Sequence, residues 1–241
     1  RWNTQDAPLQ HIVVNAGPDA DARKLAALGD KLFVRCAKHF DDLSRTAEIA
    51  TPNPHLDMSF RAHVIALDAA YESPLILHGA QAWRAQYLGW RNCHGFDAIG
   101  WHDRARSHLL AHAEGQLDIP YQGGLLPSTY EGKGSGYEMS QVFLDMLLYN
   151  YEWTGDLKMM ESLLSRLRLI LEAERSLYGH DNNFLYTNRL NFNISDAHWF
   201  YGSPCPGASA YLYRAYRGLV RVLKKLGKPY SAYEERMQGI R

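Results

Sequence analysis

The sequence has few cysteines, no excess of charge of either sign and no long apolar run, and each absence excludes a class of protein. Lys plus Arg and Asp plus Glu number 26 each, so no basic field attracts nucleic acid or an anionic membrane surface. No stretch approaches the roughly eighteen continuous apolar residues that a membrane-spanning helix needs. The three cysteines, Cys36, Cys93 and Cys205, are widely spaced, form no CxxC pair and leave the compartment undetermined.

Common catalytic motifs are also missing. There is no HExxH, no Gly-x-Ser-x-Gly, and the glycine-rich run at 132–136 lacks the Gly-Lys-Ser/Thr ending of a phosphate loop. His102, His108 and His112 lie close in sequence, with Glu114 nearby, and the last two histidines share a helical face. Spaced histidines on an amphipathic helix are more often polar or packing residues, so we expect neither a metal nor a cofactor.

The 241 residues permit one large domain or two small ones, and no linker favours two. We therefore expect a single domain over 1–241. Because the chain opens on Arg1 and Trp2, with no initiator Met or signal peptide, we also expect it to be a trimmed or excised piece of a larger polypeptide. Aromatic residues make up 12%, a proportion that suits either a ligand cleft or a dense core.

Helical periodicity dominates and predicts an all-α protein. The expected helices cover about 17–39, 57–71, 103–116, 137–153, a leucine-rich stretch from 157, 208–226 and a last one cut off at 241. Long connections at 73–102, 117–136 and 179–206 alternate with the short corners 154–156 and 227–229. This alternation favours an α/α toroid, with its long loops gathered at one rim, over a solenoid. Seven helices make about three and a half hairpins, so a six-hairpin barrel would be incomplete.

Carboxylates on the long connections are the first candidates for chemistry. Asp97 and Asp103 flank Gly100 and Trp101, where a neighbouring indole and arginine can tune a carboxyl pKa. Glu138 and Asp196 lie on the other connections. Each has a purely structural alternative: Asp103 as a helix cap, Glu138 as a favourable charge at a helix start, and Asp196 in an Asx turn.

Two segments resemble the six-hairpin, (α/α)6-barrel glycoside hydrolases. The corner Trp153-Thr154-Gly155-Asp156 is similar to a junction that recurs in those families. The run from Asp97 to Asp103 resembles the rhamnosidase-like segment in which a carboxylate, usually Glu, precedes Gly-Trp and then an Asp. In that family the first carboxylate is the proton donor. The resemblance therefore implies that Asp97 is the catalytic acid, and that the enzyme is secreted or periplasmic.

Hydrolysis needs a second carboxyl group, about 5 to 5.5 Å away in a retaining enzyme and about 6.5 to 9.5 Å in an inverting one. Glu138 and Asp196 are the eligible residues. For binding an oligosaccharide or polysaccharide we expect Trp83, Trp90, Trp101, Asp103, Arg104, His198 and Trp199. Two alternatives stay open: a non-catalytic carbohydrate-binding or scaffold toroid, and a carbohydrate lyase with a Tyr or His base and a basic cleft.

Overall fold

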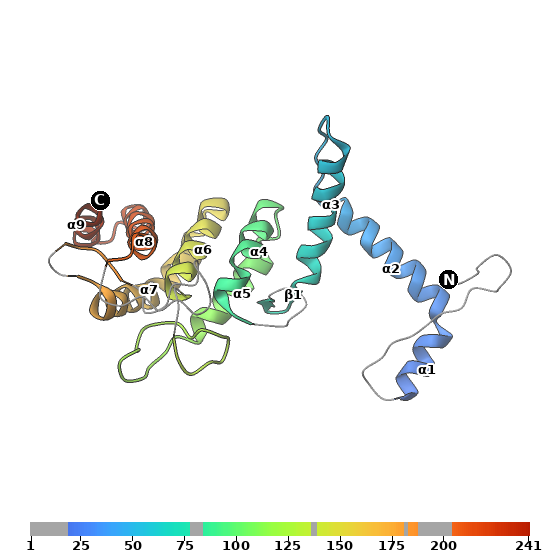
Figure 1. The fold of residues 1–241 in the computed structure, drawn as a ribbon, viewed down its shortest axis with the longest axis horizontal. Helices are drawn as coiled ribbons and strands as arrows, with labels where there is room; N and C mark the ends of the chain where they lie inside the picture. The colour runs from blue at the N-terminus through green and yellow to red at the C-terminus, as the bar shows by residue number, and fades with distance from the viewer. Residues whose placement is uncertain (1–18, 78–83, 136–138, 181–182, 188–203) are drawn as a thin grey trace. The chain divides into compact units, whose positions relative to one another are not determined.

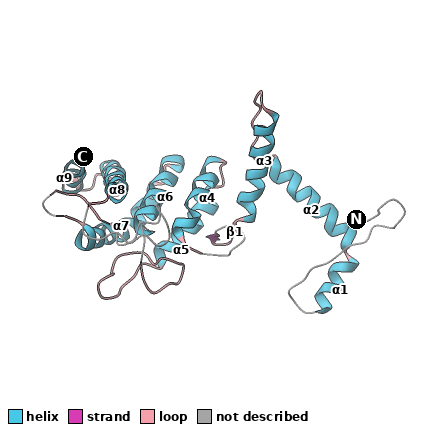
Figure 2. Ribbon diagram, viewed as in Figure 1, coloured by secondary structure: helices cyan, strands magenta, loops and turns pink. Residues whose placement is uncertain are grey.

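A computed structural model describes residues 19–77, 84–135, 139–180, 183–187 and 204–241. Figure 2 shows that these residues are mostly helical, with one short pair of strands. The prediction of a predominantly helical protein is therefore confirmed. The described chain falls into two compact units, Arg1–Asp68 and Ala69–Arg241. The expectation of one domain over 1–241 stays a prediction.

The first unit contains α1 (Asp19–Ala27), α2 (Gly29–Ser44) and most of α3 (Pro54–Ala69). One helix was expected over 17–39, but the chain bends at Leu28, whose φ of −100° and ψ of 6° interrupt the helical path. α3 covers nearly the same residues as the helix expected at 57–71. On α2 the side chains of Phe33 and Val34 are exposed.

The second unit opens on a hairpin and then a helix that the periodicity did not reveal. β1 (Tyr71–Glu72) and β2 (Leu75–Ile76) pair antiparallel around Ser73-Pro74, with Tyr71 opposite Ile76. α4 (Gln86–Ala98) follows. The expectation of a continuous long connection over 73–102 is therefore wrong. α4 packs close to β2, since a Cβ on Gly89 would lie 3.4 Å from the Ile76 side chain.

The remaining helices match the periodic segments closely. They are α5 (His102–Glu114), α6 (Met139–Thr154), α7 (Leu157–Tyr178), α8 (Pro206–Lys225) and α9 (Ser231–Ile240). The predicted corner between α6 and α7 is confirmed. Gly155 takes a φ of +64°, which suits glycine at a helix end, and the Asp156 carboxylate accepts a hydrogen bond from the Met159 N–H at 2.9 Å.

The helices of the second unit form three consecutive hairpins, α4–α5, α6–α7 and α8–α9. Their first members, α4, α6 and α8, lie side by side in a row, with α6 in contact with both neighbours (Figure 1). Most positions of α6 are buried, so it is the central helix of the unit. Gly218 lets α8 approach it closely: a Cβ there would lie 2.6 Å from Cδ1 of Leu148.

Candidate functional site

Asp97 lies in the last turn of α4 and links this helix to α5 and α6. Its Oδ1 accepts hydrogen bonds from Nδ1 of His102 at 2.9 Å and from Nδ2 of Asn150 at 2.7 Å. Its Oδ2 is buried and has no hydrogen-bond partner among the described residues. Burial raises the pKa of Asp97, while the hydrogen bonds from His102 and Asn150 act in the opposite direction. The side chain has no exposed surface, and its contacts hold the α4–α5 corner against α6.

This corner lies beside the short α6–α7 corner rather than among the long loops. Arg106 of α5 forms an ion pair with Asp156, which caps α7. The connection at 117–136 leaves from the opposite end of α5, roughly 20 Å away for a helix of this length. Asp97 and the α4–α5 corner therefore lie apart from that connection. The middle of the expected 73–102 connection does meet it, since the Tyr130 N–H donates to the Arg84 carbonyl at 2.7 Å and the Gln86 side-chain amide donates to the Pro127 carbonyl at 3.1 Å. The gathering of all the long loops at one rim stays a prediction.

The residues that follow Asp97 pack on one another. The guanidinium carbon of Arg104 lies 4.2 Å from the ring centre of Trp101 and 5.0 Å from that of Tyr71, within the range of cation–π attraction. Asp103 is exposed on the first turn of α5. The N-cap position belongs to Trp101 and no side chain caps the helix, so the capping alternative for Asp103 is wrong.

Five of the predicted site residues lie outside the described part of the chain. They are Trp83, Glu138, Asp196, His198 and Trp199. Of the predicted substrate-binding tryptophans, Trp90 and Trp101 are described. Trp101 is part of the Arg104 stack, whereas Trp90 lies on α4 and belongs to a different group of aromatic rings.

We call this group the aromatic face; it consists of Trp90 and His94 on α4 and Tyr149 and Trp153 on α6. The rings form a continuous series. The ring centres of Trp90 and His94 lie 5.5 Å apart in an edge-on arrangement. Those of His94 and Tyr149 lie 4.2 Å apart with the rings tilted, and those of Tyr149 and Trp153 lie 6.3 Å apart. Trp90, His94 and Tyr149 are half-buried and Trp153 is exposed. Aromatic rings placed in this way can carry the apolar face of a sugar.

A nearly buried carboxylate, Asp145, lies beside the aromatic face. Only 5% of Asp145 is exposed. Its Oδ1 lies 3.0 Å from Nη2 of Arg214 on α8, and its Oδ2 lies 3.8 Å from Nε2 of His94. Burial raises the pKa of Asp145, while the charges of Arg214 and His94 act to lower it. Burial also lowers the pKa of His94. Three elements of the helix row thus share one electrostatic cluster.

A small hollow opens next to Asp145 between α6 and α8. Its volume of about 10 Å³ is room for roughly one water molecule. A second carboxylate, Glu152, lines it, together with an arginine stripe on α8 made of Arg214, Arg217 and Arg221. Glu152 pairs with Arg221 at 3.7 Å, so both carboxylates of α6 face arginines of α8. The hollow therefore combines acidic groups with a local excess of positive charge.

Two of the three histidines singled out as possible metal ligands, His108 and His112, are buried in α5, whereas the third, His102, is partly exposed and bonded to Asp97. His108 and His112 are 0% and 1% exposed, and their ring centres lie 4.4 Å apart. Nδ1 of His108 accepts a hydrogen bond from the Ile76 N–H at 3.1 Å. Within the described residues, no group of three or more His, Cys, Asp or Glu side chains is placed to hold a metal ion.

Three residues of this site, Asp145, His94 and Arg214, were not among those predicted from the sequence. A signal for Asp145 was present, because it is a single charge within the apolar run from Val142 to Leu147, and an Asp seldom occupies a buried helix unless it is paired. His94 could not be found in this way, because α4 itself was not predicted.

Comparisons of the chain with models of known protein families and with curated protein sequences find no match. Among the helices that the structure describes, none is both long enough and apolar enough to cross a membrane.

Proposed function

We propose that this chain is part of a six-hairpin, (α/α)6-barrel glycoside hydrolase that acts on an oligosaccharide or polysaccharide. We place the sugar across the aromatic face, beside Asp145. The observation that carries this proposal is the nearly buried carboxylate next to a series of aromatic rings. A carboxyl group with a shifted pKa is one of the two that glycoside cleavage requires, and an aromatic platform can bind the sugar beside it. A secreted or periplasmic location rests on the family resemblance alone.

The arrangement of the hairpins supports the barrel. Three consecutive hairpins with their first helices in one row are what a sector of an α/α toroid would contain. The row leaves one stripe of α6 uncovered, and this stripe holds Tyr149, Glu152 and Trp153. In a closed toroid such a stripe would face the central cleft. The exposed Phe33 and Val34 on α2 fit a larger polypeptide that supplies further helices.

Asp145 is suited to act as the general base. The adjacent hollow has room for one water molecule, the nucleophile that an inverting hydrolase activates. A base works best when its pKa lies near the operating pH, and burial shifts the pKa of Asp145 upward in that direction. The charge of Arg214 acts against this shift, because it favours the ionised carboxylate.

Glu152 is the second carboxylate of the same stripe. It follows Asp145 by seven residues, or about 10 Å along a helix axis. Side-chain reach can bring the two groups into the range of about 6.5 to 9.5 Å that is typical of inversion. We assign the proton-donor role to Glu152 instead of Asp97, whose side chain has no exposed surface. Asp97 then acts as a positioning residue that holds the end of α4 against α6. Glu138 and Asp196 remain alternative donors.

The test is hydrolysis by the complete protein that contains this chain, measured as new reducing ends from a panel of polysaccharides. We expect Asp145→Asn to lower kcat roughly 10²- to 10⁴-fold, the usual contribution of a general base. The matched control is Glu161→Gln, which removes an exposed carboxylate of α7 that pairs with Lys228. NMR of the first product anomer reports inversion or retention. Activity of Asp145→Asn within a few-fold of the wild type would refute the assignment.

The arginine stripe favours a second candidate, a carbohydrate lyase acting on uronic acids. Arg214, Arg217 and Arg221 form a local basic patch that the net charge of zero conceals. Tyr149 or His94 could remove the C5 proton of a uronate, after which the C4–O bond breaks and a C4=C5 double bond forms. A lyase product absorbs ultraviolet light and a hydrolase product does not. Saturable sugar binding with neither product would support the non-catalytic alternative.

A further inference from the structure

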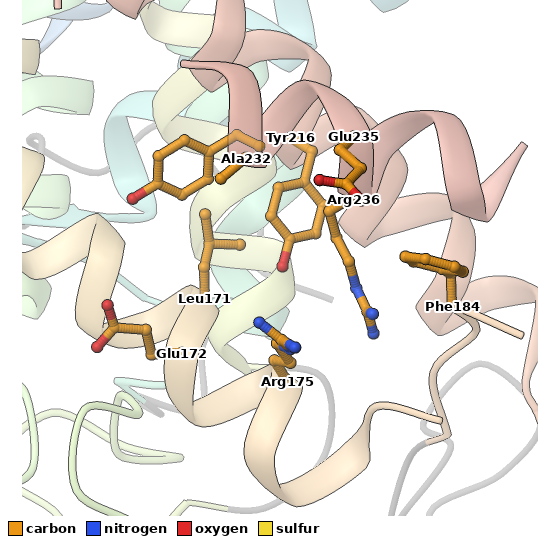
Figure 3. Close-up of a pocket in the computed structure, with 9 residues that line it drawn as sticks. Leu171, Glu172, Arg175, Phe184, Tyr216, Ala232, Glu235 and Arg236 are labelled. Carbon is orange, nitrogen blue, oxygen red and sulfur yellow. The ribbon is translucent and has the colours of Figure 1, made fainter. Parts of the chain in front are cut away.

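A pocket separate from the aromatic face lies among α7, α8 and α9. Figure 3 shows Leu171, Glu172 and Arg175 on α7, Tyr216 on α8, and Ala232, Glu235 and Arg236 on α9, with Phe184 closing one side. The pocket has a volume of about 310 Å³, which is at the lower end of the range for small-molecule sites. The proposed function makes no use of any of these residues.

Arg236 is the unusual group in this pocket, because its charge is almost fully buried. Only 7% of Arg236 is exposed. Its Nε donates a hydrogen bond to the Tyr186 hydroxyl at 3.0 Å, and its guanidinium carbon lies 4.9 Å from the ring centre of Phe184. Its Nη2 is buried and has no hydrogen-bond partner among the residues that the structure describes. An unsatisfied donor on a buried cation is strongly unfavourable unless an acceptor arrives from outside.

Arg175 supplies a second guanidinium to the same pocket. In Figure 3 the Arg175 and Arg236 side chains both end below the level of the Tyr216 hydroxyl, and both charges act on the ionisation of Tyr216. Among the described residues, no carboxylate forms an ion pair with either arginine. Glu172 and Glu235 line the pocket without approaching them to within that distance. Neither guanidinium therefore has a described carboxylate within ion-pair distance, although two glutamates line the same pocket.

The Tyr216 hydroxyl adds a neutral donor. It lies 2.9 Å from the Tyr186 hydroxyl, and either oxygen can donate in that pair. Since Nε of Arg236 already donates to Tyr186, the Tyr186 proton is free to turn toward Tyr216. The Tyr216 proton is then available to a ligand. Burial raises the pKa of Tyr216 far above its usual range, so the hydroxyl keeps this proton at neutral pH.

We propose that the pocket among α7, α8 and α9 binds a small organic carboxylate, held by the guanidinium groups of Arg236 and Arg175. A planar guanidinium matches the two oxygens of a carboxylate. The apolar walls from Leu171, Phe184 and Tyr216 would cover the organic part of the ligand. Glu172 and Glu235 at the same pocket disfavour a multiply charged anion such as phosphate. Two sources share this chemistry, a free organic acid and the uronate unit of a saccharide.

The experiment is isothermal titration of the whole chain at constant ionic strength, with sodium benzoate and sodium glucuronate as the two carboxylate probes. Benzamide tests the need for charge, and inorganic phosphate tests the anion class. We expect saturable 1:1 binding of at least one carboxylate and none of benzamide. Stronger binding of benzoate identifies a free acid as the ligand type, and stronger binding of glucuronate identifies a uronate. Equal binding of benzamide, tighter binding of phosphate, or no carboxylate binding overturns the proposal.

Because Arg236 is buried and its replacement can unfold the chain, the main variant is Arg175→Gln at an exposed position. The loss of one charge-assisted interaction predicts carboxylate binding at least about tenfold weaker. Arg35→Gln, on exposed α2, removes the same charge elsewhere and is expected to change nothing. Equal weakening by both variants would mean that only net charge matters and would overturn the site. This test does not depend on glycoside hydrolysis, so either proposal can fail alone.

Discussion

Acid destabilisation through His112 follows from its burial on α5. The residue is 1% exposed, and neither ring nitrogen has a hydrogen-bond partner among the described residues. Burial lowers the pKa of His112 from 6.5 to about 4. As the pH falls below about 6.5, His112 binds a proton in the unfolded chain but stays neutral in the folded protein. The free energy of unfolding therefore decreases. The decrease ends near pH 4, where the folded ring also binds a proton.

The size of this effect follows from the pKa difference. One pKa unit corresponds to about 1.4 kcal/mol, so a difference of about 2.5 units gives roughly 3 kcal/mol of stability, present above pH 6.5 and lost by about pH 4. His108, whose pKa burial also lowers, adds to the loss. Asp97 and Asp145 act in the opposite sense. Burial raises their pKa values, so their contributions are present at low pH and lost as the pH rises.

Comparison with His112→Leu isolates the histidine from these other groups. Urea unfolding at several pH values between 7.5 and 4.5, followed by tryptophan fluorescence, reports mainly on the second unit, since every tryptophan except Trp2 lies there. We expect the stability of the wild type relative to the variant to fall by about 2 to 3 kcal/mol over that range. The control His63→Leu removes an exposed imidazole and is expected to show no such trend. A difference between wild type and His112→Leu that is independent of pH would refute the reasoning.

Two further predictions each compare a pair of variants. Gly124→Ala is expected to lower the free energy of unfolding by roughly 2 to 5 kcal/mol, because its φ is +90° and the new Cβ would lie 2.6 Å from the Leu169 carbonyl oxygen. Gly155→Ala, with a φ of +64° but open space around it, is expected to lose only about 1 to 2 kcal/mol; equal losses in urea titrations would contradict the steric argument. Asp97→Ala is expected to lose about 1 to 3 kcal/mol by leaving Asn150 unpaired, and Asp97→Asn clearly less, since the amide oxygen still accepts; thermal unfolding at neutral pH compares the two.

The helices that could be predicted from the sequence are those whose own apolar residues recur at helical spacing. α7 places Leu163, Leu164, Leu167, Ile170 and Leu171 on one face, and all are buried. The corner before it depends on Gly155 and Asp156, which act locally at the helix ends. In both cases the residues that determine the structure lie within a few positions of it, so the sequence pattern is sufficient to predict the helix and the corner.

α4 could not be predicted because its stability depends on tertiary contacts. It contains Gly89 and Gly95, which weaken an isolated helix, and its few apolar positions do not form a clear stripe. The helix forms because Cys93 and Phe96 are fully buried and the chain packs closely against β2.

The site, too, depends partly on local sequence and partly on tertiary contacts. Asp97 drew attention because Trp101 and Arg104 follow it, but its carboxylate is directed to Asn150, which lies 53 residues later in the chain. Sequence proximity to an indole does not tell whether a carboxyl group faces solvent or a neighbouring helix. That depends on which helix covers α4, and the covering helix is specified by residues far from the motif.

Asp145 shows what a single sequence can still reveal about such a site. Burying a carboxylate is unfavourable unless a partner compensates for it, and here the partner is Arg214, which lies on the next helix of the row. A lone Asp in an apolar helix therefore indicates that a cation comes from another element. The later residues of α6 indicate the face. Positions 145, 149, 152 and 153 fall on one stripe at helical spacing, and three of the four are aromatic or exposed. The only charged residue among the buried positions of α6 lies on this stripe, so the stripe is expected to face a cation on a neighbouring helix rather than an apolar core.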